Sequence, residues 1–309
     1  MNGTDQGFLR LSKLPDDALS DLGPLQALVG TWFGNHGWNL IAVPEFDPKM
    51  GPVPFRLEIM HYSETIVFSP IGALVPNKNG KPGFMQVPGL QYELKVADSE
   101  TNQPLHVENG MWLRLDYNVP PADGFSVARL ATIPHGDSVL ALGKDSRIAG
   151  PPTIPEVSSL PDIGGAPFGY TDPYIDPNAP PKVPIDKLNL PKVLQDIIDR
   201  MPPTERIVET VILDVTAGSS SRINPQPAPG TPVGGVTNIP YIVQNANAGA
   251  FASTFWIETV KVDGASPFLQ LQYSQEVDLL FLERLDHDQK INGGKILWPH
   301  VTVNTLLKQ

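Results

Sequence analysis

The sequence predicts an all-β protein: an antiparallel up-and-down β-barrel of about ten strands, with a short N-terminal helix and a proline-rich insert carrying one short helix. Three observations lead to this prediction. Apolar and polar residues alternate at the two-residue spacing of β-strands over most of the chain. The connections between these stretches are rich in Gly, Pro, Asn and Asp, the residues of hairpin turns. Closing such a meander into a barrel removes the sheet edges that would otherwise be exposed.

The N-terminal half is expected to hold the helix and six strands. The helix falls within residues 15–29, where Leu22, Leu25 and Leu28 recur at helical spacing and Gly30 ends the pattern. Beyond Gly30 the spacing changes to two, because alternate side chains of a strand face opposite sides of a sheet. The six strands are expected at residues 38–43, 55–68, 90–97, 106–118, 125–133 and 138–142.

The middle of the chain differs in composition. Residues 150–240 contain 18 of the 34 prolines, and proline lacks the backbone N–H that a central strand needs. We therefore expect a loop-rich insert packed on the barrel, with one short helix at residues 191–201 and a strand-like run at 205–215. The chain is expected to be a single domain, residues 1–309, with the barrel at 22–149 and 236–309 and the insert at 150–235.

Strand-like sequence resumes after the insert, at residues 239–243, 250–262 and 268–282. The closing segment, residues 298–308, is largely apolar, so we expect it to be docked rather than frayed. It carries His300 into apolar surroundings. Such a histidine is either a hydrogen-bonded packing residue or a ligand, because imidazole is the side chain that binds metals most often.

The composition excludes several classes of function. With 22 Lys and Arg against 33 Asp and Glu, a net charge of −11 and no basic stripe, nucleic acids and anionic membranes are poor partners. The absence of cysteine excludes disulfides, zinc–thiolate sites, iron–sulfur clusters and thiolate nucleophiles. No secretory signal or membrane-spanning apolar run is visible, so a cytoplasmic protein is expected. The partner that a barrel favours is a small molecule in its cavity.

Four segments of the chain carry recognisable motifs. They are residues 25–34, where Gly-Thr-Trp-Phe-Gly follows the helix; 62–68, an early strand; 104–112, which contains His-Val-Glu-Asn-Gly; and 300–308, the closing segment that begins with a histidine. In this order they resemble the nitrobindin-like family of haem-binding β-barrels. The proline-rich insert has no counterpart in the short members of that family.

This resemblance implies that the barrel holds haem b and that His300 is the axial ligand of its iron. It also implies that His106 points into the cavity as a distal group, and that Thr31, Trp32 and His36 lie at or near the haem. A ferric haem held in this way is expected to bind nitric oxide or to convert peroxynitrite to nitrate, which would make the protein a peroxynitrite isomerase.

The same residues also have structural interpretations. His106 and Glu108 share one face of a strand and can form a surface ion pair. Thr31 and Trp32 can close the bottom of the barrel, and buried tryptophans mostly serve packing. The other histidines lie in turn-like or ambiguous sequences, and only the first of them has an expected role: His36, His61, His135 and His287.

Two other functions stay open at this point. Peroxidase-like activity needs a positioned acid or base beside the iron, and only His106 is an obvious candidate. A lipocalin-like or fatty-acid-binding-like carrier of an apolar molecule would use the same barrel without haem, with His300 as a packing residue and the insert as a lid. The motifs of serine hydrolases, P-loop enzymes and zinc proteases are absent from the sequence.

Overall fold

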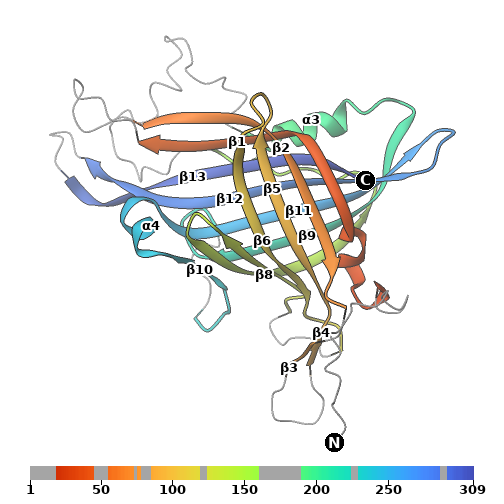
Figure 1. Ribbon diagram of the computed structural model, residues 1–309, viewed down its shortest axis with the longest axis horizontal. Coiled ribbons are helices and arrows are strands. Elements are labelled where there is room, and N and C mark those ends of the chain that lie inside the picture. Colours follow the sequence, from red (N-terminus) through yellow and green to blue (C-terminus); the bar gives the residue numbers. More distant parts are fainter. Residues whose placement is uncertain are drawn as a thin grey trace, which may run out of the picture.

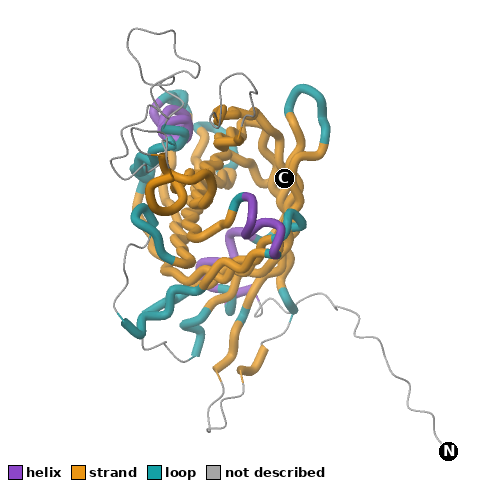
Figure 2. The backbone as a smooth tube through the Cα atoms, turned by 90° about the vertical axis from the view of Figure 1, so that its left-hand side faces the viewer, coloured by secondary structure: helices purple, strands orange, loops and turns teal. Residues whose placement is uncertain are grey.

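A computed structural model describes residues 19–44, 55–72, 75–77, 85–118, 124–159, 189–223, 229–285 and 291–309. Ten antiparallel strands in this part of the chain form a closed barrel (Figures 1 and 2), which confirms the predicted all-β up-and-down fold. The ten strands are β1 (Gly30–Pro44), β2 (Phe55–Pro70), β5 (Gly89–Asp98), β6 (Pro104–Arg114), β7 (Val127–Ile133), β8 (Asp137–Ala149), β9 (Glu205–Gly218), β11 (Asn247–Val262), β12 (Phe268–Leu285) and β13 (Ile291–Lys308).

The strands follow one another around the ring in chain order. Two pairings complete the ring: the last strand β13 returns to the first strand β1, with Trp32 opposite Lys308, and β9 pairs with the preceding barrel strand β8. The second pairing brings the backbones very close at Gly143, where a Cβ would lie 1.8 Å from the carbonyl oxygen of Asp214. Only glycine permits that approach. Two short pieces lie outside the ring: the hairpin of β3 (Val75–Asn77) and β4 (Met85–Val87), and β10 (Gly235–Asn238), which pairs with one end of β8.

A 3₁₀ helix, η1 (Gly23–Leu28), closes one end of the barrel. Leu25 and Leu28 are fully buried against the inner apolar cluster, and the indole N–H of Trp32 donates to the Leu28 carbonyl oxygen at 2.6 Å. Gly30 follows with φ of +123°, a conformation that favours glycine and turns the chain from the helix into β1. The helical entrance predicted from residue 15 is therefore confirmed in its last turns, while its first residues lie outside the described part.

Part of the outer barrel face is covered by α3 (Lys192–Asp199) and by residues 150–159. Leu190, Leu194 and Ile154 from these pieces are buried in a second apolar cluster together with residues of the barrel strands. The short helix predicted in the insert is thus confirmed. Among the described residues, no helix is both long and apolar enough to cross a membrane.

The boundaries of the insert differ from the prediction. β9 lies within the range 150–235 but is a complete barrel strand between β8 and β11. It contains no proline, and Val211, Leu213 and Val215 on alternate positions are buried inside, which is the pattern of a barrel strand. The predicted insert is therefore wrong in including these residues. Residues 160–188, which carry much of its proline, lie outside the described residues.

The strand expected at residues 239–243 is also wrong, because this stretch begins the helix α4 (Pro240–Asn245). Pro240 occupies its first turn, where the fixed φ of proline suits a helix and the missing N–H costs nothing. The apolar residues that suggested a strand, Ile239, Tyr241 and Val243, are exposed instead of packed in a sheet.

Candidate functional site

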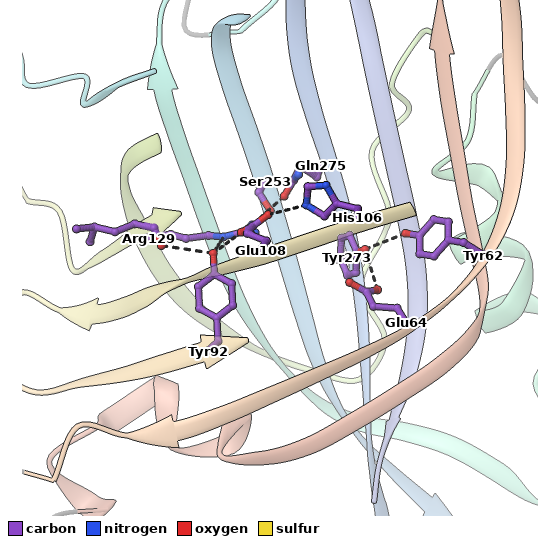
Figure 3. Close-up of polar contacts among 10 residues, drawn as sticks. Tyr62, Glu64, Tyr92, His106, Glu108, Arg129, Ser253, Tyr273 and Gln275 are labelled. Carbon is purple, nitrogen blue, oxygen red and sulfur yellow. Dashed lines mark hydrogen bonds and ion pairs between the residues drawn. The ribbon is translucent and has the colours of Figure 1, made fainter. Parts of the chain in front are cut away.

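The barrel interior contains ionisable side chains buried among apolar ones (Figure 3). Strand alternation places them there. Glu64 on β2 shares its face with Ile66, and Glu108 on β6 shares its face with Trp112, and both of these apolar neighbours belong to the inner cluster. Burial of charged groups is costly unless each is paired or neutralised, so the partners of these residues determine their chemistry.

The first group is the arginine cluster, made of Arg129, Glu108, Tyr92, Ser253 and Gln275 (Figure 3). The Arg129 guanidinium donates hydrogen bonds to Glu108 at 2.8 Å, Gln275 Oε1 at 2.9 Å, Ser253 Oγ at 3.1 Å and the Tyr92 hydroxyl at 3.3 Å. The Tyr92 hydroxyl in turn donates to Glu108. Four aromatic rings surround the guanidinium carbon, with centroids 5.3–5.8 Å away. Such contacts let a fully buried arginine remain charged.

The arginine cluster keeps its carboxylate ionised. Burial alone would raise the pKa of Glu108, but the Arg129 charge and the hydrogen bonds from His106, Tyr92 and Arg129 lower that pKa to about 2. Burial would also lower the pKa of Arg129, but the charges of Tyr92 and Glu108 raise it above its ordinary value. The two residues therefore form a buried ion pair at neutral pH.

The second group is the tyrosine cluster, made of Glu64, Tyr273, Tyr62 and Asn304. Glu64 Oε2 accepts two hydrogen bonds, from the Tyr273 hydroxyl at 2.9 Å and from Asn304 Nδ2 at 2.8 Å. The Tyr62 hydroxyl lies 2.8 Å from that of Tyr273 (Figure 3). Glu64 Oε1 is buried and has no hydrogen-bond partner among the described residues.

The tyrosine cluster contains no cation to hold Glu64 ionised. Burial raises the pKa of Glu64 to about 7, and the hydrogen bonds from Asn304 and Tyr273 oppose this only in part. The charge of Glu108 raises this pKa further and that of His106 lowers it, both by smaller amounts. Because both donors point at Oε2, the neutral acid carries its proton on Oε1.

The third group is the histidine cluster, made of His300, His106 and His135. His300 Nε2 donates to Asn39 Oδ1 at 2.7 Å, and His106 stacks on His135 with ring centroids 5.3 Å apart. Burial, and then the charges of His106 and His135, lower the pKa of His300 to about 4, so its imidazole is neutral at pH 7. His300 lies six residues before Leu306, roughly 20 Å along β13 and away from the end that η1 closes.

The donor chemistry at His300 fits a haem iron. An axial histidine must be neutral, and its second nitrogen is usually fixed by a hydrogen bond. His300 meets both conditions, because Asn39 holds Nε2 while Nδ1 makes no hydrogen bond to the described residues. The side chain keeps part of its surface exposed. No group of three or more metal-binding side chains within the described ranges is placed to hold a bare ion.

The structure places His106 and Glu108 inside the barrel. Their side chains approach to 3.6 Å, but Glu108 is only 2% exposed and His106 is partly buried. His106 and Glu108 therefore form the pair that the strand spacing predicts, but the pair lies in the barrel instead of on the surface. This position brings His106 beside Glu108, the partner of Arg129, and next to His135, a residue for which the sequence predicts no role.

The other predicted site residues do not lie beside His300. Trp32 is fully buried at the closed end, with Lys308 Nζ 5.5 Å from its ring centroid, and Thr31 beside it is exposed. His36 is exposed and borders a groove beneath α3. It lies in β1 at an irregularity in the pairing with β2, so the turn expected there is wrong. His287 lies outside the described residues.

Several polar residues of the interior were not predicted from the sequence, namely Glu64, Arg129, Asn39 and Tyr273. For two of them, the alternation of apolar and polar residues along the strand gives a signal. Glu64 lies two residues before Ile66, and Arg129 lies between Val127 and Ala131 on the same face of its strand. A charge at an inward position of a barrel strand indicates a buried pair or a functional group. Asn39 carries no comparable signal, because its contact depends on the pairing of β1 with β13.

Part of the chain matches a known family of domains. Residues 21–150 match the family model described as THAP4-like, heme-binding beta-barrel domain. The chain is also similar to the crystal structure of Rv2717c from M. tuberculosis, with 15% sequence identity and a TM-score of 0.41 over 96% of this chain and 99% of that chain. No curated protein matches the chain. The family match supports haem as the bound cofactor, and it confirms that this ten-stranded barrel resembles the nitrobindin-like haem-binding family.

Proposed function

We propose that the barrel binds haem b with His300 as the axial ligand of the iron, and that the ferric form binds nitric oxide or converts peroxynitrite to nitrate. The observation that carries this proposal is the state of His300: neutral, partly buried and held through Nε2 by Asn39, with Nδ1 making no hydrogen bond to the described residues. The match of residues 21–150 to a haem-binding family supports the choice of cofactor.

Each residue near the iron would have a distinct role. Asn39 orients the imidazole and selects the tautomer that leaves Nδ1 as the electron-pair donor. When bound, haem would supply an iron with an open position for a small ligand. His106 is proposed as the distal group that hydrogen-bonds this ligand, held in place by Glu108 and His135. Conversion of peroxynitrite to nitrate is an isomerisation, so it requires no electron donor.

Haem titration tests the axial assignment. Adding haem to the protein should give a Soret band, and His300→Ala should remove or shift it because the axial nitrogen is lost. His36→Ala is the matched control, since His36 is an exposed histidine outside the barrel interior. A Soret band unchanged in His300→Ala would overturn the assignment. Binding of fatty acids or apolar dyes without any haem uptake would instead support a carrier.

The distal role of His106 needs a separate measurement. Rates of nitric oxide binding and peroxynitrite decay are compared between the haem-loaded native protein and His106→Leu. We expect slower decay in the variant with an unchanged ferric spectrum, because the change removes a hydrogen bond but leaves His300 in place. Equal rates would remove His106 from the mechanism. A loss of peroxide-dependent substrate oxidation, with peroxynitrite decay unaffected, would favour peroxidase-like activity, for which the His106 and Glu108 pair is a suitable acid and base.

A further inference from the structure

We propose that Glu64 is a hydrogen-bond donor to the ligand inside the barrel. The proposed ligand is a small oxyanion, one oxygen of which accepts a hydrogen bond from the protonated Oε1 of Glu64. This inference deepens the proposed function by assigning a second protein contact, from Glu64, to an anionic ligand. It rests on the proposed function only in taking a small ligand to enter the barrel.

The hydrogen bonds of the tyrosine cluster define which oxygen is available. Tyr273 and Asn304 both donate to Oε2, so that oxygen is occupied as an acceptor. Oε1 is buried and unpartnered among the described residues. A neutral carboxyl with two donors on one oxygen places its hydrogen on the other. Glu64 therefore presents a donor that the described residues leave unsatisfied, and a buried unsatisfied donor calls for an acceptor.

The surroundings indicate what that acceptor is. Glu64, Tyr62 and Tyr273 are all buried, with 1%, 1% and 4% of their surface exposed, so an acceptor that reaches Glu64 Oε1 must be small. Arg129 is already paired with Glu108 and is not free to bind an anion. Glu64 in its neutral form can donate a hydrogen bond to an anion without repelling it. A hydrogen bond to an anionic oxygen is also stronger than one to a neutral acceptor. Nitrite is a suitable probe of this chemistry.

Proton occupancy should control binding at this position. Glu64 is neutral below its pKa of about 7 and becomes a repelling carboxylate above it. The other ionisable groups that act on it are Glu108 and His106 on β6, Tyr62 on its own strand and Tyr273 on β12. Glu108 stays ionised, and the pKa values of both tyrosines lie well above the ordinary value, so these three groups keep their charge between pH 6 and pH 8.5.

Glu64→Gln and Glu64→Leu separate the possibilities. Glutamine reproduces the neutral acid: its carbonyl can accept from Tyr273 and Asn304 while its NH₂ donates at the Oε1 position. Nitrite affinity is measured spectroscopically on the haem-loaded protein at pH 6 and pH 8.5. We expect the native protein to bind at least about tenfold more weakly at pH 8.5, Glu64→Gln to keep its pH 6 affinity at both values, and Glu64→Leu to bind weakly at both. His106 is present in all three proteins.

Infrared difference spectra provide a readout that needs no haem. Nitrite added to the native protein at pH 6 should shift the carbonyl band of a protonated carboxyl group, and this change should be missing in Glu64→Gln. Failure to take up haem would sink the proposed function, while the infrared shift would still decide the role of Glu64. The inference is overturned if Glu64→Gln keeps the native pH profile, if Glu64→Leu binds nitrite normally, or if no carboxyl band moves, since Oε1 would then contact only water.

Discussion

Glu64 and Glu108 are both buried in the barrel, on strands β2 and β6, and each accepts a hydrogen bond from a tyrosine. Their other partners differ. Glu108 faces the guanidinium of Arg129, whereas Glu64 faces an amide and hydroxyl groups. The pKa consequently falls to about 2 at Glu108, where burial is outweighed by the charge and hydrogen bonds, and rises to about 7 at Glu64, where burial dominates.

This difference shows how one barrel can hold a fixed charge and a movable proton side by side. The arginine cluster has no buried side-chain nitrogen or oxygen without a hydrogen-bond partner. The tyrosine cluster leaves one oxygen of Glu64 without a partner among the described residues. Pairs of carboxyl groups whose surroundings separate their pKa values are typical of sites that hold or move protons. The comparison therefore assigns structure to the first cluster and ligand chemistry to the second.

The largest effect is expected from breaking the arginine cluster. Arg129→Leu leaves the carboxylate of Glu108 buried without its cation, which should lower the free energy of unfolding by about 3–5 kcal/mol in urea denaturation. Arg147→Leu is the control. Arg147 and Glu209 form an ion pair at 2.7 Å that is exposed to solvent, so it should contribute no more than about 1 kcal/mol to the free energy of unfolding. Similar losses in both variants would contradict the assigned difference between buried and exposed pairs.

The same substitution in the two glutamates tests the comparison directly. Glu108→Gln removes the charge that neutralises Arg129 and should lower the free energy of unfolding by about 2–3 kcal/mol at pH 6. Glu64→Gln replaces an acid that is mostly neutral in the folded state at this pH but ionised in the unfolded state, so the variant should be at least as stable as the native protein. Equal destabilisation of the two variants would mean that Glu64 is ionised and paired after all.

The fold was largely predictable because its signal is local. Strand alternation and turn residues lie within a few positions of each other, and they located most of the barrel strands. β9 was recognised as strand-like but was assigned to the insert, since its proline-rich flanks dominated the composition. The strand predicted at residues 239–243 is wrong because apolar residues alone fit a strand as well as an exposed helix. Pro240 starts the helix α4, and the apolar residues Ile239, Tyr241 and Val243 are exposed.

The site was predictable only where a motif accompanied it. His300 and His106 lie in segments that resemble the haem-binding family, whereas the partners that set their chemistry come from distant strands. Asn39 is 261 residues from His300 in the chain, and Tyr273 is 209 residues from Glu64. Such contacts depend on how the barrel closes, so alternation can place a charge on the inner face without naming its partner.

A smaller effect is expected in the pH dependence of stability. The pKa of Glu64 is raised in the folded state, so its neutral form stabilises the fold fully below the unfolded value of 4.5, and this contribution is lost as the pH rises through about 7. The free energy of unfolding of the native protein, compared with that of Glu64→Gln, should fall by about 2 kcal/mol between pH 5 and pH 7. Taking the difference between the two proteins cancels the groups that they share. If the difference in free energy of unfolding between the two proteins does not change with pH, Glu64 does not titrate in this range.

The smallest effects should come from the tyrosine hydroxyls, and they should still differ between the clusters. Tyr92→Phe removes a donor to the ionised Glu108, and hydrogen bonds to charged groups are the stronger ones, so a loss of about 1–2 kcal/mol is expected. Tyr62→Phe removes a hydroxyl that contacts Tyr273 and the Val303 carbonyl oxygen, both uncharged, and should cost about 0.5–1 kcal/mol. Urea unfolding at pH 6 measures both changes. The reverse order would mean that the tyrosine cluster, with its neutral acid, stabilises the barrel more than the ion pair does.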